Sequence, residues 1–254
     1  MQTVLITGCS SGFGLETARY FLDHGWTVIA TMRTPREDLL PRHERLKIIA
    51  LDVTDAGSIA SALEMAGPID VLVNNAGIGF LNALEGTPVE TIREIFETNT
   101  IGTMAMTQAV LPQFRQKTAG VIVNVTSAVT LKALHLLSVY TASKAAVDAF
   151  TECLALELAP FGIRACLVLP GRAPTTKFGE NARARMTADN PFPEPYMPIV
   201  KGVFEHWEKD TSPVTQAFDV AEAVYRAATD PATPMRLAAG ADAIAVAADA
   251  KARG

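Results

Sequence analysis

The sequence predicts a doubly wound α/β fold, in which a parallel sheet of about seven strands carries helices on both faces. Short and nearly continuous apolar segments recur along the chain, and they are typical of strands that are covered on both faces. Helix-like segments lie between them, and this alternation favours parallel strands. The chain has 254 residues, a length at which one α/β domain is common. We therefore expect residues 1–254 to form a single domain.

Six strands can be placed from the apolar segments. They are expected at residues 3–7, 27–32, 46–51, 69–74, 120–125 and 163–169. Between the first two, the apolar spacing of residues 12–24 predicts a helix that ends before Gly25.

Two further helices are predicted from their start signals. Thr87, Pro88 and Glu90 have the spacing of a capping box, with threonine as the N-cap and proline in the first turn. The stretch DVAE at 219–222 predicts another helix start of a similar kind.

Residues 171–216 interrupt this regular pattern. The segment contains prolines and aromatic residues, namely Pro174, Pro191, Pro193, Pro195, Pro198, Pro213, Phe178, Phe192, Tyr196, Phe204 and Trp207. A segment of this length is too long for an ordinary connection between two elements. We interpret it as a lid or binding insert; the alternative is that its aromatic side chains pack into the body of the protein or a subunit interface.

Composition excludes several functional classes. With 22 basic and 27 acidic residues, the net charge is −5, and no basic run points to nucleic acid. No apolar run is long enough to span a membrane, and the first residues lack the features of a signal peptide. Cys9, Cys153 and Cys166 are scattered, which favours a reducing, cytoplasmic location and gives no metal-site spacing.

A glycine-rich loop follows the first predicted strand. Gly8, Gly12 and Gly14 lie in TGCSSGFG, where a strand turns into a helix. Glycines at such a turn let the backbone approach a phosphate, and the helix start offers free N–H groups. The spacing is T-G-x-x-x-G-x-G rather than the general dinucleotide pattern G-x-G-x-x-G.

Tyr140 and Lys144 form a second notable pair. Four residues apart on a predicted helix, they lie on the same face. A fixed cation beside a phenol favours the phenolate and lowers the tyrosine pKa. Taken alone, the pair is better explained by a partly buried tyrosine beside a surface lysine.

The motifs together resemble the classical branch of the short-chain dehydrogenase/reductase family. The glycine loop, the NNAG stretch at 74–77, Asn99, Ser127, Y-x-x-x-K at 140–144 and P-G-x-x-x-T at 170–175 occur in the family order. They cover nearly the whole chain.

The resemblance implies a role for each catalytic position. Tyr140 would act as general acid or base and Ser127 would hydrogen-bond the substrate oxygen. Lys144 would bind the nicotinamide ribose and lower the Tyr140 pKa, and Asn99 would support a water that links Lys144 to solvent. The implied cofactor contacts are Gly8, Ser10, Ser11, Gly12, Phe13, Gly14, Arg33, Asp52, Val53, Asn75, Ala76, Gly77, Tyr140, Lys144, Pro170, Gly171 and Thr175.

Residues after the second strand indicate the cofactor. Sites that prefer NAD usually carry an acidic residue there, but this chain has Met32 followed by Arg33. An arginine beside a 2′-phosphate predicts that NADP(H) is preferred over NAD(H). The alternative is a solvated surface arginine, and Ser11 stands where NADP-dependent members often carry a second basic residue. Asp52 either contacts the adenine or caps a helix.

Four further residues depart from the family pattern or stay ambiguous. Ala173 replaces a β-branched residue, and Pro174 has no N–H to offer the nicotinamide carboxamide. His135 is interpreted as a surface or packing residue, and Cys9 as a packing residue in the loop.

The sequence thus predicts an NADP(H)-dependent carbonyl reductase or secondary alcohol dehydrogenase that acts on a small hydrophobic ketone or alcohol. The alternatives are an extended-branch epimerase or dehydratase, and a redox sensor that binds the dinucleotide without turnover. The resemblance also implies a homodimer or homotetramer, and we expect no metal site.

Overall fold

The predicted fold class is confirmed by a computed structural model, which describes residues 2–174, 176–184 and 191–253. In these residues the strands form one parallel sheet in the order β3-β2-β1-β4-β5-β6-β7. The strands are β1 (Thr3–Ile6), β2 (Thr27–Met32), β3 (Leu46–Ala50), β4 (Val71–Asn74), β5 (Gly120–Val125), β6 (Ile163–Pro170) and β7 (Arg236–Ala239).

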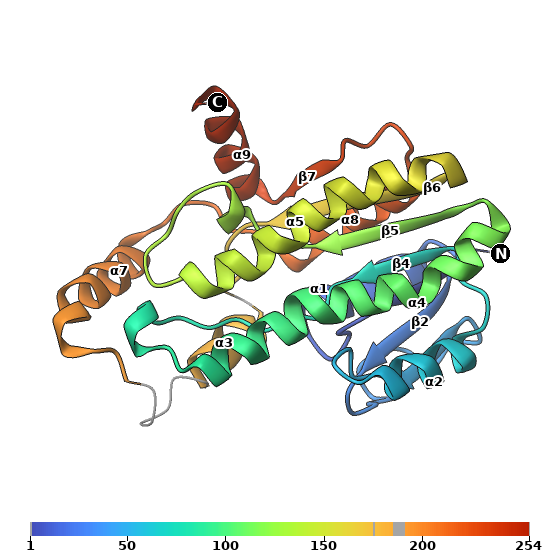
Figure 1. Cartoon of the computed structure of the whole chain (residues 1–254), viewed down its shortest axis with the longest axis horizontal. Helices are drawn as coiled ribbons and strands as arrows, with labels where there is room; N and C mark the ends of the chain where they lie inside the picture. The colour runs from blue at the N-terminus through green and yellow to red at the C-terminus, as the bar shows by residue number, and fades with distance from the viewer. Residues whose placement is uncertain (1, 175, 185–190, 254) are drawn as a thin grey trace.

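Helices cover both faces of this sheet (Figure 1). They are α1 (Gly12–Asp23), α2 (Ala56–Ala66), α3 (Val89–Phe96), α4 (Gly102–Lys117), α5 (Ser138–Leu158), α6 (Lys177–Ala184), α7 (Met197–Lys209), α8 (Ala217–Thr229) and α9 (Ala241–Arg253). A π-helical turn, Glu97–Ile101, joins α3 to α4 without a break.

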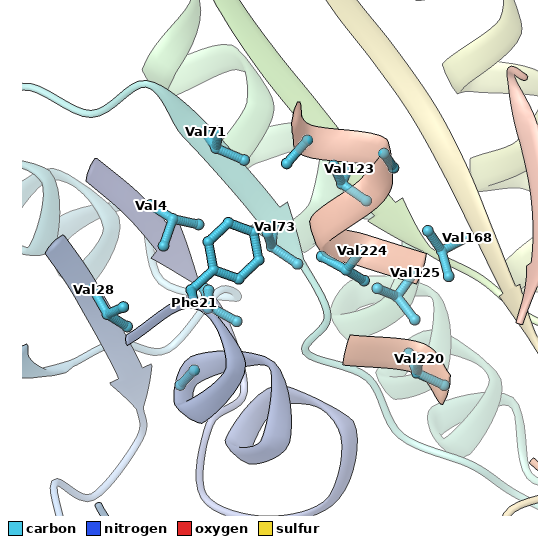
Figure 2. Packing of buried hydrophobic residues seen from close by; sticks show 14 of the residues in the cluster. Val4, Phe21, Val28, Val71, Val73, Val123, Val125, Val168, Val220 and Val224 are labelled. Carbon is cyan, nitrogen blue, oxygen red and sulfur yellow. The ribbon is translucent and has the colours of Figure 1, made fainter. Parts of the chain in front are cut away.

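One face of the sheet packs on α1 and α8. Figure 2 shows Phe21 of α1 and two valines of α8, Val220 and Val224, against a row of strand valines. The row contains Val4, Val28, Val71, Val73, Val123, Val125 and Val168, all buried. Because side chains alternate along a strand, the intervening residues Leu5 and Leu72 point to the other face.

That other face packs on α2, α4 and α5. Its core contains Ile59 of α2, Phe114 of α4 and Leu154 of α5, together with leucines and isoleucines of the strands. A sheet that is apolar on both faces explains why six of its strands can be placed from continuous apolar runs in the sequence.

The seventh strand could not be placed from sequence. The segment RLAA at Arg236–Ala239 pairs with β6, but it is short and lacks the β-branched and aromatic residues that mark strands. The six strands placed from sequence are found with ends shifted by no more than two residues.

The predicted capping box at Thr87 is wrong. The helix begins one residue later than expected, with Pro88 as the N-cap of α3. The Thr87 hydroxyl instead donates to Ala83 O at 2.8 Å, which closes the preceding turn.

The helix start proposed at 219–222 is also displaced. α8 begins at Ala217, and its capping box pairs Gln216 with Asp219. Glutamine is a poor N-cap by statistics, so the sequence pattern places the N-cap three residues too late, at Asp219 instead of Gln216.

Residues 171–216 are more regular than the sequence suggested, because α6 and α7 form within them. Figure 1 shows α7 at one end of the molecule, beyond the carboxyl ends of the strands. Four of the five aromatic side chains, Phe192, Tyr196, Phe204 and Trp207, pack with Leu81 and Leu136 in a small separate core. These four side chains are partly buried and pack apart from the two main cores of the sheet.

Both ends of this segment are fixed at one point. Thr215 N donates to Arg172 O at 2.8 Å, and Thr215 Oγ1 accepts from Gly171 N at 2.9 Å. The same hydroxyl lies 2.7 Å from Asp242 Oδ1, and Asp242 Oδ2 accepts from Arg172 N at 2.6 Å. The first and last residues of the segment are thereby tied to the start of α9.

We predict that Thr215→Val lowers the free energy of unfolding by about 1–3 kcal/mol, because Gly171 N and Asp242 lose a buried partner while side-chain shape is kept. The matched control is Thr229→Val, at an exposed position where the hydroxyl donates only to Tyr225 O within its own helix. Urea unfolding of both variants measures the difference. Equal losses would show that the network at Thr215 adds no stability.

Candidate functional site

Four predicted side chains meet at the carboxyl edge of the sheet. Ser127 follows β5, Tyr140 and Lys144 lie on the first two turns of α5, and Asn99 lies in the π-helical turn between α3 and α4. The carboxyl ends of parallel strands are where doubly wound folds bind ligands. All four side chains are buried.

Asn99 holds the loop after β4 against α5. Its Oδ1 accepts from Ile78 N at 2.8 Å, and its Nδ2 donates to Ile78 O at 2.9 Å and to Ser143 Oγ at 3.0 Å. The π-helical turn widens the helix where this side chain enters, and such turns are frequent at functional sites.

Lys144 extends into the space between Asn99 and the strand ends. Its Nζ donates to Val125 O at 3.0 Å. A Cβ on Gly77 would lie 3.3 Å from Lys144 Nζ and 3.2 Å from Asn99 Oδ1, so only glycine leaves this space free. Burial lowers the pKa of Lys144 to about 8, and the negative charge of Asp148 opposes that shift.

Tyr140 and Ser127 are hydrogen-bonded through their side chains. Burial raises the pKa of Tyr140, and the bond to Ser127 acts in the opposite direction. The sequence led us to expect a Tyr140 pKa lowered by Lys144. In this structure burial is the larger influence, because the phenol is removed from water and the ammonium is directed to Val125 O.

The glycine loop forms an open cradle at the start of α1. Gly8 has a φ of +75°, and a Cβ there would lie 2.9 Å from Ala76 Cα. A Cβ on Gly14 would overlap Gly8 O. Ser11 is the N-cap of α1 but makes no side-chain capping bond. First-turn N–H groups without a side-chain cap, beside glycines, fit the pyrophosphate of a dinucleotide.

Asn75 and Ala76 hold this cradle in place. The Asn75 Nδ2 donates to Thr7 O at 2.9 Å and Gly8 O at 3.2 Å. The Thr7 hydroxyl accepts from Asn75 N at 3.0 Å and from Ala76 N at 2.9 Å. The Asn75 side chain therefore fixes the loop, and Thr7 is a supporting residue that sequence reasoning did not single out.

Arg33 is exposed directly after β2. The nearby Asp52 accepts from Thr54 N at 3.0 Å and Thr54 Oγ1 at 2.7 Å. These bonds lower the pKa of Asp52, and Arg33 contributes to the same shift. Asp52 therefore shapes the loop before α2, while Asp55 is the N-cap of that helix.

The remaining predicted contacts are distributed around the cradle. Ser10 is exposed, Phe13 is partly buried on the core, and Val53 is buried against Gly102. Pro170 ends β6 beside Gly171, and Thr175 lies outside the described residues.

Two ambiguous residues behave as the sequence suggested. His135 is exposed. Burial raises the pKa of Cys9 to about 12, which leaves its thiol unreactive in the loop.

The core also contains a buried polar chain that the sequence did not lead us to expect. Asn74 and Asn124 face each other across β4 and β5, with Asn74 Nδ2 donating to Asn124 Oδ1 at 2.9 Å. Asn74 also donates to Thr107 Oγ1 at 3.1 Å, and Asn124 donates to Thr151 Oγ1 at 2.8 Å. The sequence does carry a signal, since each asparagine is one of the last two residues of an otherwise apolar strand.

The start of the proposed lid lies over the site. The Tyr140 and Phe178 ring centroids are 5.6 Å apart, and a Cβ on Gly79 would lie 2.7 Å from the Phe178 ring. Thr176 is buried beside Gly12. The segment thus contacts both the glycine loop and the candidate catalytic tyrosine.

Within the described ranges, no group of three or more His, Cys, Asp or Glu side chains is arranged to hold a metal ion. No described helix is both long enough and apolar enough to cross a membrane.

Residues 2–186 match the family model for short chain dehydrogenases. The chain is 37 % identical over 242 residues to the uncharacterized oxidoreductase YusZ of Bacillus subtilis, covering 90 % of this chain and 85 % of the relative. It is 40 % identical over 174 residues to 3-ketodihydrosphingosine reductase of Bacteroides thetaiotaomicron, covering 67 % and 63 %. Retinol dehydrogenase 8 of Bos taurus is 36 % identical over 229 residues, covering 81 % and 72 %.

Solved structures share the fold. A short-chain dehydrogenase from Streptomyces avermitilis has a TM-score of 0.82 at 33 % identity, covering 99 % of this chain and 92 % of that chain. The closed form of serine dehydrogenase complexed with NADP+ scores 0.79 at 29 % identity, covering 94 % of each. A 3-ketoacyl-(acyl-carrier-protein) reductase from Brucella melitensis complexed with NADH scores 0.75 at 26 % identity, covering 93 % and 96 %.

The buried ammonium of Lys144 predicts a specific pH dependence of stability. Its pKa is about 8 in the folded protein, against 10.5 for an ordinary lysine side chain, so unfolding takes up a proton between these pH values. Wild-type stability should therefore rise with pH across this window relative to Lys144→Met. The free energy of unfolding of Lys144→Met minus that of wild type should therefore fall by about 3 kcal/mol from pH 8 to 10.5.

Urea unfolding at several pH values measures this difference. Lys201→Met, at an exposed position of α7, controls for the loss of one lysine. A constant difference between wild type and Lys144→Met would contradict the prediction.

Proposed function

The chain belongs to the short-chain dehydrogenase family of oxidoreductases that act on alcohol and carbonyl groups, and we propose that it transfers hydride between NADP(H) and a hydrophobic ketone or secondary alcohol. The proposal covers residues 1–254 as one domain that binds cofactor and substrate, with residues 171–216 as its lid. The convergence of Tyr140, Ser127 and Lys144 beside the glycine cradle carries it.

Tyr140 is the proposed proton-transfer group. Its phenol would protonate the carbonyl oxygen during reduction and accept the proton during oxidation, while Ser127 hydrogen-bonds the same oxygen. A protonated phenol is the form needed for reduction, and the raised pKa of Tyr140 favours it. A bound nicotinamide would supply the hydride or accept it.

Lys144 and Asn99 support this tyrosine. Lys144 lies beside Gly77, where its ammonium could reach both a cofactor ribose and the Tyr140 region. The side-chain amide of Asn99 and the backbone of Ile78 fix the adjoining loop, and the hydrogen bond from Lys144 Nζ to Val125 O orients the lysine. Such preorganisation is the usual contribution of residues around a reacting group.

Arg33 supports the preference for NADP(H). It is exposed after β2, at the place where an acidic residue would hold the ribose in a site for NAD. The other nearby arginine, Arg36, is already paired with Asp38 at 2.6 Å. Related structures contain NADP+ in one case and NADH in another, so the preference must come from this chain's own residues.

The substrate side supports an apolar partner. Phe178 lies on Tyr140, and Leu136 joins the aromatic side chains of α7 in one apolar cluster. Two relatives carry names of enzymes for long apolar molecules, retinol and ketodihydrosphingosine. An apolar surface above the tyrosine favours substrates that water solvates poorly.

We predict that Tyr140→Phe reduces turnover by about 10²–10⁴-fold while nucleotide binding persists, because only the hydroxyl is removed. Steady-state rates and nucleotide fluorescence titration provide the two measurements. Tyr20→Phe, on α1, is the control. Activity above about a tenth of wild type would refute the assignment.

Arg33→Ala should raise the KM for NADPH by about 10- to 100-fold and leave the KM for NADH nearly unchanged, since only NADPH carries the 2′-phosphate. Arg36→Ala is the matched control, because its guanidinium is engaged by Asp38. A wild type that prefers NADH would overturn the cofactor proposal, and equal losses with both nucleotides would make Arg33 structural.

For a series of ketones of increasing apolar size, kcat/KM should rise with each added methylene. Each buried methylene should strengthen transition-state binding by up to ~0.8 kcal/mol. Phe178→Ala should flatten this dependence, because the ring over Tyr140 is removed. Competitive rates with matched ketones provide the readout. Preference for small polar substrates, such as the serine of one relative, would count against the apolar pocket.

A further inference from the structure

We propose that Asp148 is a positioning residue whose carboxylate serves as the counter-ion of Lys144, and that Arg236 holds this carboxylate in place from the neighbouring strand. The inference deepens the proposed function and rests on it for its catalytic meaning. Its structural part can be tested without any substrate.

A tyrosine, a cation and two acids follow one another along one face of α5. Tyr140, Lys144, Asp148 and Glu152 recur at every fourth residue, so each lies about one turn from the next. Arg236 of β7 joins the two acids: its Nη1 is 3.2 Å from Asp148 Oδ2, and its Nε is 2.7 Å from Glu152 Oε1. The line leads from the buried tyrosine to the protein surface.

Lys144 requires a negative partner in this position. Its side chain is buried, with a residue exposure of 5 %, and its hydrogen bond goes to a neutral group, Val125 O. A buried ammonium that has only a neutral acceptor is costly unless an opposite charge lies close. Asp148, with an exposure of 3 %, is the acid whose charge favours the protonated form of Lys144.

Polar and charged groups from the segment after β5, from β7 and from α5 itself surround Asp148. Burial raises its pKa, while the hydroxyls of Thr130 and Thr126 and the charge of Arg236 lower it; Glu152 raises it slightly. In the described part of the chain, Asp148 Oδ1 and Thr126 Oγ1 complete no hydrogen bond of normal geometry. Arg236 therefore makes the defined ionic contact, at Oδ2.

A purely structural role is the competing explanation. Asp148 could serve only to fasten α5 to β7 through Arg236, with no influence on Lys144. The two explanations differ in one respect. Only the counter-ion role makes the effect of Asp148 depend on a charged Lys144.

A double-mutant cycle separates them. Urea unfolding at pH 7 is measured for wild type, Asp148→Asn, Lys144→Met and the double variant. The asparagine keeps the side-chain shape and removes the charge. We expect Asp148→Asn to lower the folding equilibrium constant about tenfold more in the wild-type background than in the Lys144→Met background, the effect of about one pKa unit of charge interaction.

The same cycle at pH 10 provides the second test. Lys144 has a folded pKa of about 8, so at pH 10 it is largely neutral in the native protein. The interaction between the two sites should then disappear. Equal losses in both backgrounds at pH 7, or an interaction unchanged at pH 10, would overturn the proposal in favour of a structural role.

The catalytic readout is the pH profile of kcat/KM for ketone reduction. In Asp148→Asn we expect the loss of activity at alkaline pH to begin about one unit lower than in wild type, with recovery at lower pH where Lys144 is protonated again. Glu152→Gln is the matched control. It removes the other acid bound by Arg236, at an exposed position, and should leave the profile in place.

The two levels of inference can fail separately. If Tyr140→Phe remains active but the cycle shows the interaction, the proposed function fails and the counter-ion stands. If Tyr140→Phe is inactive but the Asp148→Asn profile and cycle show no interaction, the counter-ion fails and the proposed function stands.

Discussion

A positive charge carried into the protein interior by Lys144 is the constraint on which the candidate site depends. Water cannot solvate this ammonium, so the surrounding backbone and side chains must do so. Val125 O accepts a hydrogen bond from the ammonium, and Gly77 leaves space for it. Asp148 supplies negative charge from the next helical turn. The arrangement keeps a charged lysine buried at the candidate site at a cost in stability, as functional sites often do.

The polar chain behind the site carries this order into the core. Asn74 and Asn124 bind each other across two strands and reach Thr107 of α4 and Thr151 of α5. Buried amides have strict geometric demands, because an unpaired donor or acceptor in an apolar core is costly. These bonds therefore fix the register of both helices on the sheet, and hence the position of the turns that carry Asn99 and Tyr140.

Local sequence signals failed where tertiary contacts dominated. Thr87 has the spacing of a helix cap, yet its hydroxyl closes the preceding turn on Ala83. The segment Arg236–Ala239 has a weak propensity for β-structure. It forms a strand because the backbone edge of β6 is available to pair with it. Residues 171–216 have an irregular sequence pattern, but helices α6 and α7 form within them. Their aromatic side chains pack with Leu136 in a small core.

The sequence by itself determined the alternation of strands and helices, the parallel sheet and the glycine loop, because these follow from apolar periodicity and from backbone freedom within short windows. It also placed Tyr140 and Lys144 on one helical face. Only the tertiary structure decided the electrostatics of that face, since burial and charges from distant segments set a pKa. Asp148 and Arg236 are 88 residues apart. No local pattern could show that Arg236 holds Asp148 in place one helical turn from Lys144.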